Sequence, residues 1–208
     1  MKKGVKIMNK IITIGREFGS GGREFGRKLA ELLGFPYYDR EIISEIAKRT
    51  SLSEKYIQNI AENKPIIPFP IHTGRTFFTV MPDYGQSVQS EQHNIIREVA
   101  SKSSCVIVGR GADYILRDLN PFRIFVYSDI ESKIKRCREN QSNDYEHAEL
   151  NDKELTKRIE QINKSRSDYY EFYTGQKWGD KSNYDLCINT TFVTPDKLAS
   201  AVELIIKE

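Results

Sequence analysis

The chain has 208 residues, enough for one α/β domain with an insertion, and its 32 Lys and Arg against 29 Asp and Glu leave a formal net charge of only +3. So mild an excess argues against nucleic acid or an anionic membrane surface as the main partner. No run approaches the roughly 20 apolar residues that span a bilayer, and the basic first residues lack the apolar core of a signal peptide, so we expect a cytoplasmic protein.

Short apolar segments alternate with helical patterns along a single domain over 1–208. Residues 1–8 are expected to be a flexible extension, and the first strand begins at Ile11. A glycine-rich turn follows, and then a helix over 22–33 that Gly34 ends. Continuous apolar strands indicate burial on both faces, so we predict a three-layer α/β fold with a parallel sheet. The other strands are expected at 35–39, 105–109, 123–128 and 184–189, and the other helices at 40–50, 88–102, 130–140 and 195–208.

Two segments depart from this alternation. The first, 63–87, is rich in proline and lies between the second and third strands. A substrate-binding insertion and a plain surface excursion both account for it. The second, 151–180, is a long charged helix followed by an aromatic stretch. Its aromatic side chains suit the protein core or a contact between copies of the chain in a homo-oligomer; they are Tyr169, Tyr170, Tyr173 and Trp178.

The cysteines and histidines suggest no metal site. Cys105, Cys137 and Cys187 form no CxxC pair, and the first and last of them fall in apolar strands, so we expect buried reduced thiols. The three histidines are scattered without the spacing of metal ligands. A divalent ion is therefore expected to arrive with a phosphate ligand.

The turn in "IITIGREFGSGGREFG", residues 11–26, is the main functional signal. Glycines between a strand and a helix let backbone N–H groups point at an anion, and the helix N-terminus adds a partial positive charge. The P-loop pattern GxxxxGK[ST] places Gly22 where lysine is expected, followed by Arg23 and Glu24 where small and hydroxyl residues are expected. A simple tight turn and an anion-binding loop without catalysis are the alternatives.

Two arginines flank this turn. Arg16 precedes it and Arg23 follows it. A guanidinium binds phosphate through two hydrogen bonds, so either arginine is able to compensate for the missing lysine.

Five motifs together resemble the cytidylate kinase-like branch of the P-loop nucleoside monophosphate kinases, over about residues 9–208. They are "IGREFGSGGREFGRKLAELLGFPYYDREII", "VIVGRGADYIL", "RIFVYSDIESKIKR", "RSDYYEFYTGQKW" and "YDLCINT". The resemblance implies a five-stranded parallel sheet of order 2-3-1-4-5, a helical monophosphate-binding insertion at about 50–87 and a lid at about 140–180. It also implies transfer of the γ-phosphoryl group of ATP, bound with Mg²⁺, to a nucleoside monophosphate, with CMP or dCMP favoured.

The resemblance assigns roles to individual residues. Arg110 follows a buried strand and matches the arginine that holds the acceptor phosphate, and Arg166 falls near the lid arginines. Arg136 and Arg138 lie at the start of the lid, where exposed charge on a helix explains them equally well. The expected catalytic residues are Arg23, Arg110 and Arg166; the expected ATP-binding residues are Arg16, Gly19, Ser20, Gly21, Gly22, Arg23 and Glu24; the expected acceptor-binding residues are Asp39, Arg40, Arg110 and Asp113.

The acceptor motif departs from the family pattern. After Asp39 the chain reads "REIISE" in place of a small-residue, Tyr and Arg pattern, and Gly111 stands where the family has Asp. Asp113 is the candidate to replace that Asp. Asp39 itself suits contact with the acceptor or a magnesium-bound water, and equally the capping of helix 40–49.

Two other functions remain open at this point. One is a nucleotide-binding sensor or scaffold without catalysis, favoured by the missing lysine and hydroxyl. The other is a small-molecule kinase with a non-nucleotide acceptor, favoured by the altered acceptor motif. A nucleic-acid module is disfavoured because no basic stripe interleaved with aromatic residues is present outside the lid.

Overall fold

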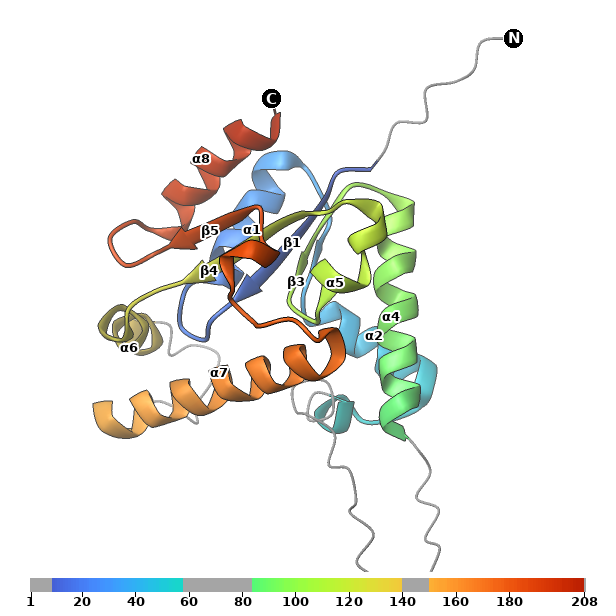
Figure 1. Ribbon diagram of the computed structural model, residues 1–208, viewed down its shortest axis with the longest axis horizontal. Coiled ribbons are helices and arrows are strands. Elements are labelled where there is room, and N and C mark those ends of the chain that lie inside the picture. The colour runs from blue at the N-terminus through green and yellow to red at the C-terminus, as the bar shows by residue number, and fades with distance from the viewer. Residues whose placement is uncertain (1–8, 58–83, 140–149, 208) are drawn as a thin grey trace, which may run out of the picture.

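A five-stranded parallel sheet forms the centre of the protein, seen in a computed structural model that describes residues 9–57, 84–139 and 150–207 (Figure 1). The strand order is β2-β3-β1-β4-β5, and each neighbouring pair is parallel. This confirms the predicted order. The strands are β1 (Ile11–Arg16), β2 (Tyr37–Tyr38), β3 (Cys105–Val108), β4 (Phe122–Tyr127) and β5 (Leu186–Asn189).

The helices follow the predicted alternation, with α1 at its predicted bounds and α4 beginning four residues earlier than the expected 88. Residues 1–8, most of the expected insertion (58–83) and the first part of the expected lid (140–149) lie outside the described residues. The helices are α1 (Gly22–Leu33), α2 (Glu41–Thr50), α4 (Tyr84–Lys102), α5 (Ala112–Ile115), α6 (Ile130–Glu139), α7 (Asp152–Thr174) and α8 (Pro195–Lys207), with 3₁₀ turns at η1 (Arg117–Leu119) and η3 (Lys181–Asn183).

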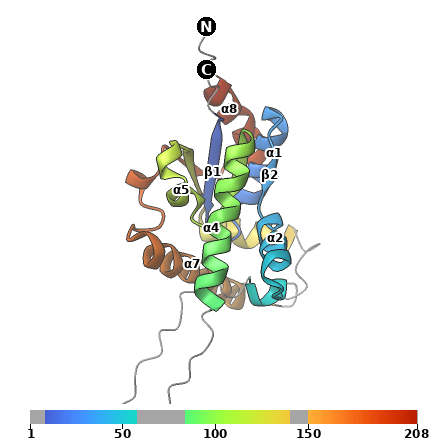
Figure 2. The same cartoon turned by 90° about the vertical axis from the view of Figure 1, so that its right-hand side faces the viewer.

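Helices cover both faces of the sheet, and each face has its own hydrophobic core (Figure 2). Side chains alternate along β1, so Ile11 joins the core under α2, α4 and α5, while Ile12 and Ile14 join the core under α1 and α8. Val106 and Ile107 of β3 divide between the two cores in the same way. The predicted three-layer architecture is therefore present.

The edge strand β5 is an exception to the predicted burial on both faces. β1 and β3 are almost wholly buried, but in β5 only Ile188 is buried and Cys187 is exposed. The prediction of a buried Cys187 thiol is wrong because β5 has a neighbour on one side only. Cys105 is buried as expected, and burial raises its pKa to about 11. In the described ranges, no helix has the length and apolar character needed to cross a bilayer.

Helix α7 runs across the end of the sheet toward which β1 points, in both views (Figures 1 and 2). Its first turn is fixed by a capping box in which Asn151 accepts from the Glu154 N–H and Glu154 accepts from the Asn151 N–H. Gly175, in the left-handed conformation with φ of 67°, ends it. The carboxyl ends of β1 and β3, where parallel sheets bind ligands, therefore face this helix.

Candidate active site

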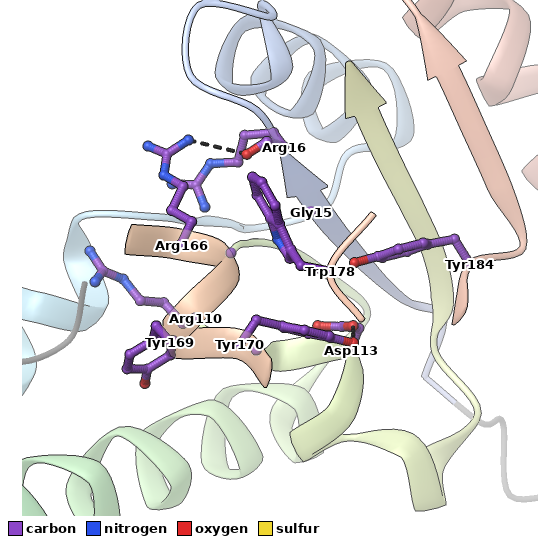
Figure 3. A pocket seen from close by; sticks show the side chains of 11 residues that line it. Gly15, Arg16, Arg110, Asp113, Arg166, Tyr169, Tyr170, Trp178 and Tyr184 are labelled. Carbon is purple, nitrogen blue, oxygen red and sulfur yellow. Dashed lines mark hydrogen bonds between the residues drawn. The ribbon is translucent and has the colours of Figure 1, made fainter. Parts of the chain in front are cut away.

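A pocket lies between the carboxyl ends of β1 and β3 and helix α7, and residues of all three line it (Figure 3). Three of the predicted arginines line it: Arg16 from β1, Arg110 from the turn after β3 and Arg166 from α7. They gather at one end, and Asp113 and Tyr184 lie at the other. The complete lining is Gly15, Arg16, Gly109, Arg110, Gly111, Asp113, Arg166, Tyr169, Tyr170, Trp178 and Tyr184.

The glycine turn next to this pocket has the geometry of an anion cradle. Gly19 and Gly21 adopt the left-handed conformation, with φ of 74° and 76°, which strains any residue that has a Cβ. Gly21 caps α1 without any side-chain acceptor for the N–H groups of the first turn. A Cβ on Gly21 would stand 2.7 Å from Cγ of Pro195. An uncapped, tightly packed helix start of this kind fits a phosphate group.

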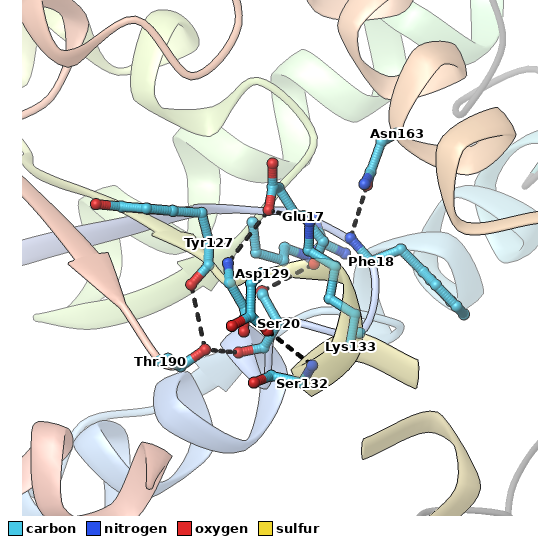
Figure 4. A network of polar contacts seen from close by, with 12 residues as sticks. Glu17, Phe18, Ser20, Tyr127, Asp129, Ser132, Lys133, Asn163 and Thr190 are labelled. Carbon is cyan, nitrogen blue, oxygen red and sulfur yellow. Dashed lines mark hydrogen bonds and ion pairs between the residues drawn. The ribbon is translucent and has the colours of Figure 1, made fainter. Parts of the chain in front are cut away.

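Ser20 of the predicted loop holds the turn together through its hydroxyl and its carbonyl oxygen. Ser20 is fully buried, and its hydroxyl donates to the Glu17 carbonyl oxygen at 2.8 Å. The Thr190 hydroxyl donates to the Ser20 carbonyl oxygen at 2.7 Å (Figure 4). Gly22, at the lysine position of the pattern, has no room for a side chain, because a Cβ there would lie 2.5 Å from Cβ of Arg16. The P-loop lysine is thus excluded by packing.

Helix α6 adds two cations to the turn. Nζ of Lys133 lies 2.6 Å from Oε2 of Glu17, and the same oxygen accepts from the Ser128 N–H at 3.3 Å. Nη1 of Arg136 donates to the Gly19 carbonyl oxygen at 2.8 Å, so Arg136 is not simply a solvated charge. Lys133 is buried, and the sequence reasoning missed it. The available signal was its place on the same helical face as Arg136, three residues away.

Asp39 is a buried carboxylate between two arginines. Its Oδ2 lies 2.6 Å from Nε of Arg23, and its Oδ1 lies 3.5 Å from Nη2 of Arg16. The expectation that Asp39 caps the helix is wrong, because Arg40 is the cap residue of α2 and no side chain caps it. Burial and the charge of Asp39 raise the pKa of Tyr37 to about 12.

Arg40 lies away from the pocket, and the side chain of Arg23 is directed away from the glycine turn. Arg40 is exposed and lines a separate groove between α2 and α4, together with Glu41 and Lys102. Arg23, in the first turn of α1, directs its guanidinium to Asp39. Glu24 follows it in that same turn.

The turn after β3 presents Arg110 in an unusual backbone conformation. Gly109, Arg110 and Gly111 have φ of 74°, 63° and 64°, three left-handed residues in a row. A buried arginine rarely adopts this conformation, and such strain is typical of functional positions. Gln92 of α4 supports the turn, because its Nε2 donates to the Arg110 carbonyl oxygen at 3.2 Å and to the Tyr169 hydroxyl at 3.0 Å.

Asp113 lies at the aromatic end of the pocket. The Tyr170 hydroxyl donates to its Oδ2 at 2.6 Å and is 3.1 Å from Oε1 of Gln176. Burial raises the pKa of Asp113 above that of an ordinary carboxyl, although the Tyr170 hydrogen bond opposes the shift. Trp178, which also lines the pocket, packs its ring edge-on against Phe125 with centroids 5.2 Å apart.

Helix α7 holds the backbone of the glycine turn through two side chains three residues apart. Nη1 of Arg166 donates to the Arg16 carbonyl oxygen at 3.1 Å. Oδ1 of Asn163 accepts from the Phe18 N–H at 2.7 Å (Figure 4). The sequence reasoning named Arg166 and missed Asn163, whose polar side chain on a charged helix gave no signal. The predicted lid helix and the predicted phosphate loop are therefore in direct contact.

The chain matches the cytidylate kinase-like family over residues 11–192. It belongs to this family of kinases. Cytidylate kinase from Methanopyrus kandleri is 25% identical over 94% of this chain and 92% of its own length. Cytidylate kinase from Staphylothermus marinus is 27% identical over 95% of this chain and 97% of its own length. The sequence resemblance is thus confirmed at the level of the family.

Solved structures agree with this cytidylate kinase-like fold. An uncharacterized protein from Eubacterium ventriosum superposes with a TM-score of 0.69 at 31% identity, covering 96% of this chain and 99% of that one. Shikimate kinase from Bacteroides thetaiotaomicron superposes with a TM-score of 0.58 at 16% identity, over 96% and 99% of the two chains. The second likeness shows the kinase fold alone.

Proposed function

We propose that the protein transfers the γ-phosphoryl group of ATP to a nucleoside monophosphate, with CMP or dCMP as the favoured acceptor. The observation that carries the proposal is the gathering of Arg16, Arg110 and Arg166 in one pocket beside the uncapped start of α1. Phosphoryl transfer depends on positioning and on neutralising charge, which guanidinium and backbone N–H groups supply. The cytidine preference rests on the names of the relatives from Methanopyrus kandleri and Staphylothermus marinus.

The groups have separate tasks in this reaction. An oxygen of the acceptor phosphate attacks the γ-phosphorus, the bond from that phosphorus to the β,γ-bridging oxygen breaks, and ADP leaves with the bond electrons. Gly19 to Arg23 and the first N–H groups of α1 hold the donor phosphates, and Arg110 holds the acceptor phosphate. Arg166 joins the lid helix to the loop and excludes water. No general base of the protein is required, because the acceptor phosphate is already an anion.

The acceptor nucleoside would occupy the space between Arg110 and the aromatic end of the pocket. Asp113, Tyr170 and Tyr184 offer hydrogen-bonding groups there, and Trp178 offers an apolar wall. Asp39 fixes Arg16 and Arg23 at the edge of this space. Contact of Asp39, Arg40 and the segment 50–87 with the acceptor stays a prediction.

Mg²⁺ fits this site as an ion carried by the nucleotide. Within residues 9–57, 84–139 and 150–207, no group of three His, Cys, Asp or Glu side chains is placed to hold a metal. Arg23 stands at the hydroxyl position of the P-loop pattern, and the Ser20 hydroxyl is bonded to Glu17. The ion would neutralise the charge of the β- and γ-phosphates and take most of its ligands from them and from water.

The test is ADP formation by the purified protein with Mg²⁺ and ATP, comparing CMP, dCMP, UMP, AMP and GMP with a reaction that has no acceptor. Strong stimulation by CMP or dCMP is expected. Stimulation by another monophosphate would retain the kinase and overturn the cytidine preference. ATP binding without stimulation by any monophosphate would favour a sensor or a kinase with a non-nucleotide acceptor.

A further inference from the structure

The chain departs from the P-loop pattern at two positions, the lysine and the first glycine. With Gly21 and Gly22 at the last glycine and the lysine of GxxxxGK, the first glycine of the pattern falls five residues before Gly21, at Arg16. The chain therefore has a cation where the pattern has glycine, and glycine where the pattern has a cation. The two departures from the pattern therefore compensate each other in charge: one cation is lost at position 22 and one is gained at position 16.

These two positions touch in space. A Cβ on Gly22 would lie 2.5 Å from Cβ and 3.0 Å from Cγ of Arg16, and its next neighbour would be Cβ of Val126 at 3.4 Å. The first distance is too short for real atoms and the second is tighter than most real contacts, whereas the third is close to ordinary contact. The stem of the Arg16 side chain thus fills the space that a side chain at Gly22 needs.

We propose that Arg16 and Gly22 have exchanged roles, so that the guanidinium of Arg16 contacts the transferring phosphoryl group in place of the P-loop lysine. The inference rests on the proposed kinase function. Arg16 leaves the end of β1 and enters the pocket that Arg110 and Arg166 also line, between the glycine turn and the turn after β3. A cation at this point bridges the donor and acceptor phosphates.

The contacts of Arg16 and Arg23 distinguish the two candidates for this role. Asp39 lies 2.6 Å from Arg23 but 3.5 Å from Arg16, so Arg23 makes the closer ion pair. The side chain of Arg23 is 37% exposed and that of Arg16 only 10%. Arg16 also lines the pocket, and Arg23 is not among its lining residues. We therefore assign Arg23 to the orientation of Asp39, and Arg16 to the phosphate.

The decisive experiment compares the wild-type protein with Arg16→Gly, Gly22→Lys and the double variant Arg16→Gly/Gly22→Lys. Monophosphate-stimulated ADP formation is measured, together with the dissociation constant for ADP and the thermal unfolding midpoint. Arg16→Gly removes the cation, and Gly22→Lys forces a side chain into occupied space, so each single change is expected to lower kcat/KM at least about a hundredfold. The double change restores the lysine and the space for it, and at least a tenfold recovery over either single variant is expected.

Recovery over Gly22→Lys follows from relief of the clash alone, so the informative comparison is with Arg16→Gly. A double variant more active than Arg16→Gly cannot be explained by a purely structural role of Arg16, because the lysine at position 22 starts from a different element. A double variant no more active than Arg16→Gly, or Arg16→Gly with nearly wild-type turnover, would refute the exchange. Arg16→Lys and Arg16→Gln form a second pair that leaves Gly22 unchanged. Turnover retained by the lysine variant and lost by the glutamine variant is expected, and equal loss in both would also refute it.

The controls separate this inference from the proposed function. Arg23→Ala is expected to lower kcat/KM less than Arg16→Gly does, and the reverse order would return the lysine role to Arg23. If the wild-type protein shows no stimulation by any monophosphate, the proposed function fails. The exchange is then tested by the dissociation constant for ADP of the wild type, the two single variants and the double variant. Affinity is expected to fall in each single variant and to recover in the double variant.

Discussion

Two turns follow neighbouring strands of the sheet and differ in what they present to the pocket. The turn after β1 has left-handed glycines at 19 and 21, and its Ser20 hydroxyl is directed back to the backbone. The turn after β3 has an arginine between two glycines, all three of them left-handed. The first is built to present N–H groups, and the second to present the side chain of Arg110.

The difference also concerns where the positive charge comes from. Arg110 carries its own charge into the second turn. The first turn contains the carboxylate of Glu17 and takes its cations from neighbouring elements: Arg16 at the end of β1, Lys133 and Arg136 of α6, and Arg166 of α7. A backbone cradle is therefore sensitive to changes of shape, whereas a side-chain site is sensitive to changes of charge.

A change of shape in the first turn should have the largest effect. Gly21→Ala adds a strained left-handed alanine and a Cβ 2.7 Å from Pro195, so the turn must move. Losing two hydrogen bonds to phosphate costs about 3 to 6 kcal/mol, and more than a hundredfold in kcat/KM for ATP is expected. Steady-state kinetics and ADP titration measure it.

The matched control is Gly34→Ala at the other end of α1. Gly34 has φ of 68°, but nothing lies within 4 Å of an added Cβ. The Gly34→Ala variant should lose about 1 to 2 kcal/mol of stability, because alanine is strained in the left-handed conformation, and it should keep the wild-type affinity for ATP. Equal kinetic loss in both variants would mean that strain alone, and not the cradle, explains the effect of Gly21→Ala.

A change of charge in the second turn should come next. Arg110→Ala removes a guanidinium that we assign to the acceptor phosphate, at a cost of about 1.5 to 3 kcal/mol, or about 10- to 150-fold in kcat/KM for the acceptor. The KM for ATP should change little. Arg117→Ala is the control, because this exposed arginine packs over the Tyr114 ring outside the pocket. An equal rise in KM for both substrates would contradict the separation of the two turns.

Loss of the Lys133–Glu17 ion pair beside the first turn should have a smaller effect on ATP affinity, and a second substitution should partly reverse it. Lys133→Met leaves the Glu17 carboxylate without its lysine partner beside the bound phosphates, and about a tenfold rise in the dissociation constant for ATP is expected. Glu17→Gln added to Lys133→Met removes that negative charge and should recover part of the affinity. Calorimetric titration of Lys133→Met, Glu17→Gln and the double variant beside the wild type gives the coupling energy. Independent, additive losses would mean that the pair does not act through its charge.

Local patterns predicted much of this molecule. The bounds of α1 followed from a glycine turn before it and Gly34 after it, both of which act within a few residues. Arg110 was located because it follows a buried strand, and strands of this kind carry sites at their carboxyl ends. The strand order came from the family resemblance, which covers nearly the whole chain.

Contacts between distant segments were the part that sequence did not predict. Asn163 and Phe18 are 145 residues apart in the sequence, and no local pattern around either residue predicts their hydrogen bond. Helix capping was one of the two roles that the sequence allowed for Asp39, but the fold brings two arginines to its carboxylate instead. Cys187 lies in an apolar stretch of sequence, but it is exposed because its strand, β5, is at the edge of the sheet.

The smallest predicted effect concerns the pH dependence of stability beside the second turn. Burial raises the pKa of Asp113, so the folded protein keeps its proton to higher pH than the unfolded chain does. Stability is therefore lost as pH rises above the ordinary Asp pKa of about 4. Asp113→Asn removes this titration, so the stability of the variant relative to wild type should improve between pH 4 and pH 7.

Asp185 supplies a control of opposite sign. Hydrogen bonds from Arg123 lower its pKa, so its contribution is present above the ordinary Asp pKa and is lost as pH falls below it. Asp185→Asn should therefore lose stability relative to wild type at pH 7 and lose less at acidic pH. Urea unfolding at pH 4 and pH 7 measures both variants. Slopes of the same sign would show that Asp113 is ionised in the folded pocket, and a charged carboxylate would then face the acceptor nucleoside.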